Sequence, residues 1–244
     1  MTLLRDDILL EQLAAMDAAE VLRYAFDRHG LRAAIGTSLQ KTGIVTIDLA
    51  AELGIPYRVF FIDTELNHPE TYELLEQVER RYGITVERFR PDPADVEELR
   101  RSVGQFAHFL ARPQCCGIRK RKPLQRAVES LDVWIAGLRA DQSEHRGNTA
   151  RKAEWASDEN GRAVLKLNPL VDWTAEKVDE YSRRRDLPYN KLYDYRSAYG
   201  ERYTVIGCQC CHIPVLDHLG ERAGKFPWEQ GKKECGLHDK GSAI

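Results

Sequence analysis

The chain has 244 residues, of which 43% are hydrophobic and 30% are charged, and its formal net charge is −2. This length is enough for one sizeable core, as a single large domain or as a domain with an appendage, and the near-neutral charge argues against a general nucleic-acid binder. Because no stretch has the ~18 to 20 continuous apolar residues of a membrane span and the N-terminus lacks a signal-peptide pattern, we expect a cytoplasmic enzyme.

Helix and strand patterns alternate from the start of the chain. Apolar residues recur at helical spacing over residues 6–29, which predicts one amphipathic helix that stops at Gly30. Residues 31–35 are predicted to form a short strand. A turn-rich loop at residues 36–43 follows, and then an apolar helix that ends near Gly54.

The alternation continues along the chain. Further predicted elements are strands at residues 58–62, 85–89 and 133–138, helices at 69–81, 93–103 and 174–185, and a hairpin at 154–167 that turns at Asn160-Gly161. Strands that alternate with helices predict an α/β fold with a doubly wound, mostly parallel sheet and helices on both faces. In such sheets, ligands bind at the carboxyl ends of the strands.

From Tyr199 onward the hydrophobic periodicity is lost, and four of the six cysteines lie in this last stretch. We therefore divide the chain into an α/β domain at residues 1–198 and a C-terminal segment at residues 199–244. We expect that segment to be a functional flap and not an independent domain.

The loop at residues 36–43 is a candidate anion site. It precedes a helix, so its backbone N–H groups and the helix N-terminus could hold an anion. It is not a Walker A loop, because Lys41 stands where the second glycine of that motif belongs. An ordinary polar turn is the alternative.

The six cysteines form an adjacent pair at Cys115 and Cys116, a dense group at Cys208, Cys210 and Cys211, and the single Cys235. Such crowding does not fit a secreted disulfide framework. Zinc usually takes separated Cys-x-x-Cys pairs, whereas an iron–sulfur cluster accepts irregular spacings. The pattern therefore favours four iron ligands and one nucleophile over a zinc site or buried unreactive thiols.

Basic residues gather where an anion would need them. Arg119 and Lys120 directly follow the cysteine pair, and Arg139 and Arg146 follow the strand predicted at residues 133–138. Arginine binds sulfate or phosphate through two parallel hydrogen bonds, and lysine binds it as a point charge. A solvated helix face is the alternative for the first pair.

Cys235 is the candidate nucleophile. Lys232, Lys233 and His238 are its neighbours in sequence, and positive charge lowers the pKa of a thiol and favours the reactive thiolate. No second cysteine lies within Cys-x-x-Cys reach, so a covalently modified Cys235 would need an outside thiol for regeneration. For His238, a simple tail histidine is the alternative.

The runs at residues 115–120, 206–211 and 234–238 together resemble the assimilatory sulfonucleotide reductases, specifically the iron–sulfur adenosine 5'-phosphosulfate (APS) reductases. Supporting matches lie at residues 63–72, 137–143 and 187–190, and the resemblance extends from about Leu31 to His238. It implies an adenine nucleotide α-hydrolase-like sheet with a modified P-loop after the first strand.

The resemblance also implies roles for individual residues. The residues that match nucleotide-binding and phosphosulfate-binding positions of the family are Ser38, Ile62, Asp63, Thr64, Lys120, Gly137, Arg146, Arg222 and Lys225. His238 matches a residue beside the nucleophile. Cys115, Cys116, Cys208 and Cys211 match the ligands of a [4Fe–4S] cluster, which leaves Cys210 as a bystander or a substitute for Cys211.

This chain departs from the family pattern at several positions. The loop from Gly36 to Lys41 has one serine, Ser38, and no acidic residue, where many relatives have two serines and an acidic residue. Lys225 occupies a position where relatives often have arginine. A lysine there binds an anion as a point charge, whereas an arginine would form a bidentate contact. His212 stands where threonine is usual.

The mechanism that the resemblance implies begins with attack of the Cys235 thiolate on the sulfur of APS. AMP leaves, and an enzyme Cys-S-sulfonate remains. Reduced thioredoxin, or a glutaredoxin-like donor, then releases sulfite. The cluster would organise the site and would not supply the electrons. Relatives form homo-oligomers.

Three alternatives stay open. One is a phosphoadenylylsulfate (PAPS) reductase or an enzyme with dual specificity. Another is an ATP-dependent ligase or tRNA thiolase on the same fold, which would want an intact Ser-Gly-Gly-x-Asp-Ser loop. The last is a noncatalytic iron–sulfur regulator, which would have no use for Cys235.

Overall fold

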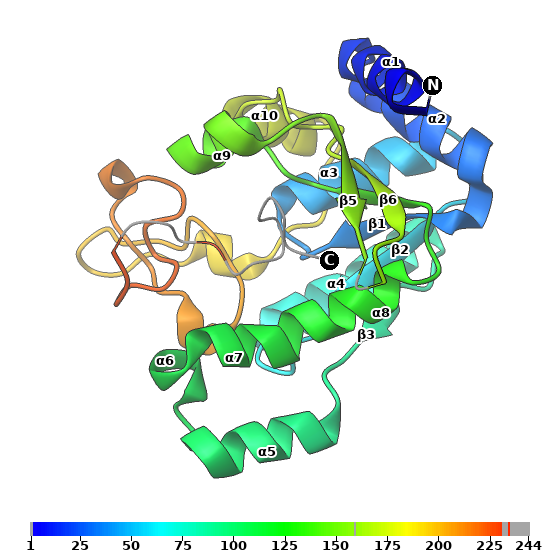
Figure 1. Cartoon of the computed structure of the whole chain (residues 1–244). Helices are drawn as coiled ribbons and strands as arrows, with labels where there is room; N and C mark the ends of the chain where they lie inside the picture. Colours follow the sequence, from blue (N-terminus) through cyan, green and yellow to red (C-terminus); the bar gives the residue numbers. More distant parts are fainter. Residues whose placement is uncertain (1, 159, 231–233, 235–244) are drawn as a thin grey trace.

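A computed structural model of the protein describes residues 2–158, 160–230 and 234. At its centre is a six-stranded sheet in the order β3-β2-β1-β4-β6-β5 (Figure 1). The strands are β1 (Ala33–Thr37), β2 (Arg58–Ile62), β3 (Glu87–Phe89), β4 (Val133–Ala136), β5 (Ala153–Ser157) and β6 (Ala163–Leu167). All neighbours pair in parallel except β5, which runs antiparallel to β6. The predicted doubly wound, mostly parallel sheet is confirmed.

Ten α-helices are assigned in the described residues. They are α1 (Thr2–Ala15), α2 (Ala18–His29), α3 (Lys41–Glu52), α4 (Pro69–Tyr82), α5 (Pro93–Val103), α6 (Ala107–Leu110), α7 (Arg112–Cys116), α8 (Lys122–Val128), α9 (Glu144–Thr149) and α10 (Ala175–Arg184). A π-helical turn, Gly117–Arg121, joins α7 to α8.

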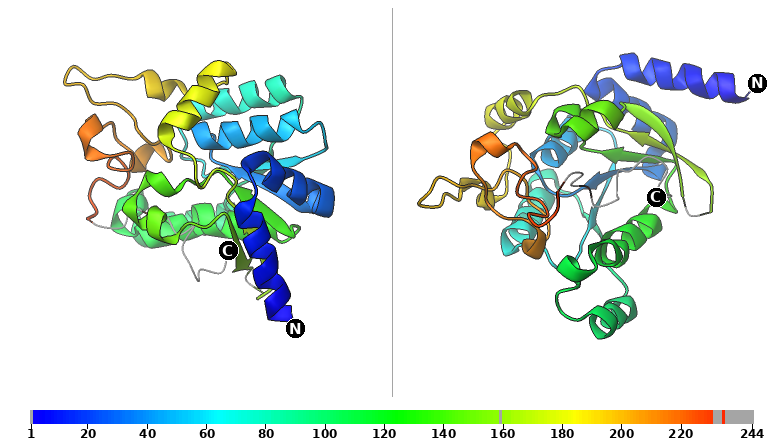
Figure 2. Two further views of the ribbon diagram at one scale, coloured as in Figure 1. Left: turned by 90° about the horizontal axis from the view of Figure 1, so that it is seen from above. Right: turned by 60° about the vertical axis from the view of Figure 1, so that its left-hand side comes forward.

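Helices cover both faces of the sheet, as Figures 1 and 2 show. Alternate residues of β1 face opposite sides: Ala33 and Ile35 pack with α2, α3, α4 and α10, whereas Ala34 packs with α8. Because both faces are buried, residues 33–36 of the strand are apolar instead of alternating with polar residues, and only the last residue, Thr37, is polar. This explains why strand periodicity alone could not mark its bounds.

Several predicted elements differ from the observed ones. The single helix expected at residues 6–29 is two helices, because Asp17 caps α2: its side chain accepts from Glu20 N–H, and the Glu20 side chain accepts from Asp17 N–H. A 3-10 turn, Gly30–Arg32, delays the first strand to Ala33. The strand predicted at residues 133–138 ends at Ala136.

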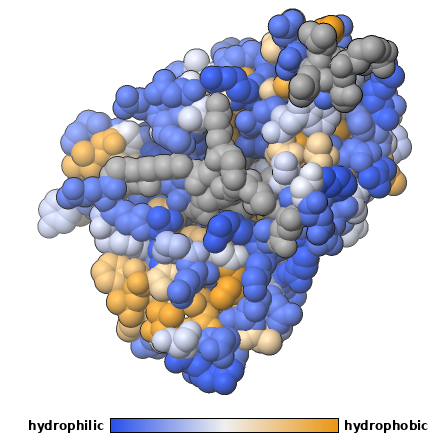
Figure 3. Space-filling model, viewed as in Figure 1, coloured by the Kyte–Doolittle hydropathy of each residue, from blue (hydrophilic) through white to orange (hydrophobic). Residues whose placement is uncertain are grey.

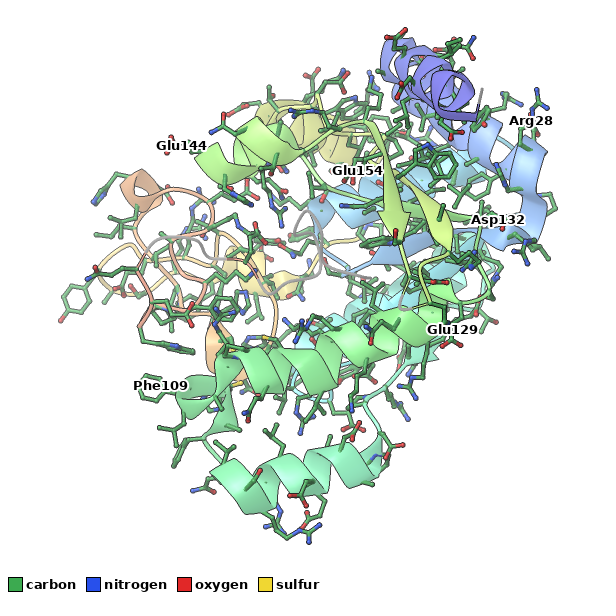
Figure 4. The ribbon with its side chains drawn as sticks, in the orientation of Figure 1. Arg28, Phe109, Glu129, Asp132, Glu144 and Glu154 are labelled. Atoms are coloured by element: carbon green, nitrogen blue, oxygen red, sulfur yellow. The ribbon has the colours of Figure 1, made fainter. Side chains whose placement is uncertain are left out.

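Helices α6 to α8 form a region that the sequence patterns did not delimit. α6 exposes Phe106, its N-cap, together with Phe109 and Leu110, and the Phe109 ring meets the edge of Trp228 at 5.3 Å between centroids. Figure 3 shows apolar surface at the lower left, and Figure 4 shows Phe109 projecting there.

The chain after Tyr199 has no long helix or strand among its described residues. Short contacts join it to the loop after β2: Asn67 pairs with Cys208, and Gln209 N–H donates to Leu66 C=O at 2.7 Å. Arg202 pairs with Val215 within the segment itself. Both figures place residues 200–230 away from α1 and α2 (Figures 1 and 2). None of the described helices is long and apolar enough to cross a membrane.

Candidate active site

A cavity of about 160 Å³ opens where β1, β2 and β4 end. Its walls are the loop after β1, the start of α3, the ends of β2 and β4, and the segment after residue 204. Eight of the described residues that were predicted to bind the substrate line this cavity: Ser38, Ile62, Thr64, Lys120, Gly137, Arg146, Arg222 and Lys225. This cavity lies at the carboxyl ends of the strands, where ligands bind in sheets of this kind.

Two glycines give the cavity its shape. A Cβ at Gly36 would stand 2.6 Å from both the Phe60 ring and the Trp134 indole nitrogen. A Cβ at Gly137 would stand 3.0 Å from the backbone of Thr42 and Gly43 at the start of α3. Both positions need glycine because side chain or backbone already fills the space.

The loop after β1 closes with side-chain help. Thr37 Oγ1 accepts from Leu39 N–H at 3.0 Å, and Leu39 has a φ of 56°, in the left-handed region that nonglycine residues rarely adopt. This turn places Gln40 at the N-cap of α3, and no side chain caps that helix end. Uncapped N–H groups at a helix N-terminus can bind an anion.

One buried carboxylate, Glu234, gathers three cations of the cavity. Arg146 donates to its two oxygens at 2.9 and 3.2 Å, Arg222 donates at 3.0 Å, and the Lys225 ammonium lies 3.8 Å away. Glu234 is only 8% exposed. Burial alone would raise its pKa, but the hydrogen bond and charge of Arg146 and the charges of Lys225 and Arg222 lower it to about 2.

Arg139 belongs to a different cavity. It pairs with Asp141 at 2.8 Å and with Glu221 at 2.7 Å, and these contacts lie beside a second hollow of about 190 Å³ that Lys41 and Tyr193 also line. Arg119 donates to Thr64 C=O at 2.7 Å. Neither arginine is among the described residues that line the first cavity.

Asp63 was predicted to border the nucleotide, but it is not among the described residues that line the cavity. Tyr72 Oη donates to its carboxylate at 2.7 Å, Glu65 N–H at 3.0 Å and Arg90 Nε at 3.0 Å. Burial alone would raise the pKa of this carboxyl, but these hydrogen bonds lower it below its ordinary value. The Asp63 side chain thus braces the loop after β2.

Three cysteines from distant parts of the sequence pack together. Cys116, Cys208 and Cys211 form one buried group with Phe226, and Cys210 packs at its edge. Cys115 packs with Leu99 and Ala107 in a neighbouring group. Burial, together with the charges of Cys116, Cys208 and Cys210, raises the pKa of Cys115 to about 11.

The cysteine group touches the cavity through Cys208. Its sulfur lies 3.3 Å from Thr64 Oγ1, and Cys211, the Lys120 ammonium and Thr64 lower the pKa of this thiol. Among the described residues, no set of three or more Cys, His, Asp or Glu side chains is arranged ready to hold a metal ion.

Sequence reasoning missed several residues of the cavity. Phe60, Trp134 and Gln142 line it, and so does His212, whose Nδ1 lies 3.1 Å from Cys208 C=O. Buried aromatic residues carry no functional signal in a sequence. Glu234, which contacts cations of the cavity, did have a signal in the sequence, because it directly precedes Cys235 in the run at residues 234–238. Cys235 and His238 lie outside the described residues.

Residues 32–214 match the phosphoadenosine phosphosulfate reductase domain. The chain belongs to this family. As a family member, it is 36% identical to the adenosine 5'-phosphosulfate reductase of Pseudomonas aeruginosa (strain LESB58) over 236 residues, which cover 94% of this chain and 85% of that protein. It is 33% identical to adenosine 5'-phosphosulfate reductase 2 of Bacillus subtilis (strain 168), with 96% of each protein covered.

Solved structures agree with this sulfonucleotide reductase assignment. The phosphoadenylyl-sulfate reductase of Candida auris superposes with a TM-score of 0.69 at 26% identity, over 85% of this chain and 95% of that one. The FMN adenylyltransferase of Candida glabrata shares the fold alone, with a TM-score of 0.54 at 14% identity over 85% and 64% of the chains. The predicted resemblance and fold class are confirmed.

Proposed function

We propose that this chain reduces adenosine 5'-phosphosulfate to sulfite and AMP through a covalent intermediate on Cys235. One observation carries the proposal: Arg146, Arg222 and Lys225 all contact the carboxylate of Glu234. Glu234 directly precedes Cys235 in the sequence. Buried guanidinium and ammonium groups that line one cavity suit a dianionic substrate. The names of the relatives at 33% and 36% identity favour APS as that substrate.

The cavity suggests where each part of the substrate would bind. Phe60, Trp134 and the backbone at the start of α3 fill the space beside Gly36 and Gly137, so these glycines let the strand ends and α3 pack closely at the wall of the cavity. Ile62 and Thr64 would border the nucleotide, and Ser38 would contact the phosphosulfate beside the N-terminus of α3. Lys120, Arg146, Arg222 and Lys225 would surround the anionic end.

In the proposed reaction, the Cys235 thiolate forms a bond to the substrate sulfur while the bond from that sulfur to the bridging phosphate oxygen breaks. AMP leaves with the electron pair, and the sulfonate stays on the enzyme. The cations reduce repulsion between thiolate and dianion and stabilise the charge on the leaving phosphate. A dithiol of the thioredoxin or glutaredoxin type then supplies two electrons, becomes a disulfide and frees sulfite.

The proposal includes a [4Fe–4S] cluster on Cys115, Cys116, Cys208 and Cys211, and the shared burial of three of these cysteines supports it. Cys116, Cys208 and Cys211 already share one buried group, and Cys115 is adjacent in sequence. These residues would hold the cluster through their thiolates, and its charge would polarise the site near Lys120. The protein's own part is to fix the π-helical turn that carries Lys120 against the segment that carries Cys208.

A PAPS reductase is the second candidate, favoured by the match to the Candida auris enzyme. The two candidates separate in one assay. Protein purified without oxygen should release sulfite from APS with reduced thioredoxin, and its kcat/KM for APS should exceed that for PAPS. A higher kcat/KM for PAPS would support the second candidate, and no sulfite from either nucleotide would contradict both.

A further inference from the structure

Glu234 uses the polar groups that an anionic substrate would need. Arg146, Arg222 and Lys225 line the cavity, and each of them has its charged group directed to the Glu234 carboxylate within 2.9 to 3.8 Å. Arg146 and Glu234 are separated by 88 positions in the sequence, so this contact depends on the fold. Glu234 is not among the lining residues of the main cavity.

A separate contact holds the backbone of the same residue. Arg112 Nη1 donates to Glu234 C=O at 3.0 Å, and the Arg112 guanidinium also pairs with Glu229 and lies 4.5 Å from the centre of the Phe226 ring. Arg112 begins α7, the helix of the cysteine pair. The side chain of Glu234 can therefore leave its cations while its backbone keeps an anchor.

We propose that the Glu234 carboxylate is an internal substitute for the substrate anion: it neutralises Arg146, Arg222 and Lys225 in the nucleotide-free chain, and the phosphosulfate displaces it. This inference rests on the proposed function, because it assigns the same cations to APS. The competitor is the residue bonded to the nucleophile, so substrate binding and the surroundings of Cys235 are linked.

The charges favour such an exchange. Three cations with side chains between 6% and 9% exposed would be costly to bury without an anion, and Glu234 meets that need when no substrate is present. A dianion offers more acceptor oxygens and more charge than one carboxylate, so it can replace Glu234 on the same donors. Each molecule of substrate must then compete with a carboxylate held in the chain.

The affinity for APS tests this competition. The measurement is calorimetric titration of APS into full-length protein that carries Cys235→Ser, which prevents turnover. Adding Glu234→Gln should lower the Kd for APS about tenfold. This is the change expected if the Glu234 carboxylate leaves the three cations in only about a tenth of the APS-free protein. Glu234→Asp retains a shorter carboxylate and should give an intermediate Kd. Glu97→Gln, an equal charge change on exposed helix α5, should leave the Kd unchanged.

The possible results separate the two claims. Tighter binding in the order Gln, Asp, Glu at position 234 supports the inference. A Kd that is unchanged or weaker in both Glu234 variants, with the Cys235→Ser parent binding APS, overturns the inference and leaves the proposed function standing. If the parent itself does not bind APS, the proposed function fails and the inference fails with it. Glu234→Asp keeps the charge that the buried cations need, so it provides a folded variant.

Discussion

Asp63 and Glu234 show two uses of a buried carboxylate near the same cavity. Both have depressed pKa values, in each case because cationic or hydrogen-bonding neighbours outweigh burial. The Asp63 oxygens bind Tyr72, Arg90 and a backbone N–H of its own loop, whereas Glu234 binds cations that line the cavity. Asp63 therefore stabilises the loop, and Glu234 competes for the anion site.

Asp63 should make stability depend on pH in acid. Its folded pKa lies below the unfolded one, so its contribution is present above its ordinary value of 3.8 and is lost as the pH falls through the folded pKa. Asp63→Asn should flatten this part of the profile of unfolding free energy against pH. At pH 7 the free energy of unfolding of the variant should be about 1–3 kcal/mol lower than that of the wild type, because its hydrogen bonds no longer go to a charged acceptor.

Denaturant unfolding at a series of pH values measures this effect. Asp172→Asn is the control, because Asp172 is 59% exposed in its pair with Lys152. An Asp63→Asn profile with the same acid slope as the wild type would refute the role given to this carboxylate.

Residue roles could be predicted only where a motif carried them. Ser38, Thr64, Lys120, Arg146, Arg222 and Lys225 were predicted by resemblance, and the fold brings them to one cavity. That Arg146 meets Glu234 could not be predicted, because nothing local in a sequence encodes a contact between residues so far apart. Phe60 and Trp134 were assigned no role, because a buried aromatic residue has the same pattern in any core.

Among the elements, β1 and β4 form the wall of the cavity with Gly36 inside β1 and Gly137 directly after β4. Gly36 pairs in register with Phe60 of β2 and with Ala136 of β4, at the ends of the strands. The chain turns into the loop between β1 and α3 directly after this point. The strand ends and the start of α3 are therefore packed too closely for a side chain at Gly36 or Gly137.

Gly36→Ala should destabilise the protein by about 1–3 kcal/mol, because the new methyl group overpacks a core that Phe60 and Trp134 already fill. Gly147→Ala is the matched control. Gly147 lies in α9 and its Cβ would meet nothing closer than Ala140 C=O at 3.6 Å, so this change should stabilise by about 0.4–1 kcal/mol. Equal unfolding free energies for the two variants in urea would contradict the packing described for β1.

Element types were easier to predict than element ends. The helices at residues 69–81 and 93–103 were predicted within one residue, since proline begins each and glycine follows each. The break between α1 and α2 had a readable signal in Asp17 and Glu20, which have the spacing of a capping box. Unbroken apolar periodicity across that signal led to the wrong prediction of one helix.

At the scale of the whole molecule, the segment of residues 200–230 completes the cavity with only short 3-10 helices and isolated bridges. It contributes Cys208, His212, Arg222 and Lys225 to a cavity otherwise built by the sheet. Its anchors are bridges and buried sulfur atoms, which have no periodic pattern. The sequence could therefore predict its chemistry but not its path across the sheet.

The cysteine group should stabilise the whole fold when iron is bound. Cys116→Ser should abolish visible iron–sulfur absorption and lower the thermal unfolding midpoint by roughly 5–10 °C, or about 2–3 kcal/mol, because metal binding contributes to folding energy. Cys210→Ser, at the edge of the group, should keep both properties. A Cys116→Ser protein with an unchanged visible spectrum would exclude the ligand set proposed above.

The covalent step is the central claim, and the mass of the intact protein tests it most directly. Oxygen-free protein mixed with APS in the absence of any reductant should gain the mass of one sulfonate group on Cys235, and reduced thioredoxin should then remove it as sulfite. Cys235→Ser should gain nothing. An adduct of the same mass on Cys235→Ser, or sulfite release by that variant at the wild-type rate, would contradict the account.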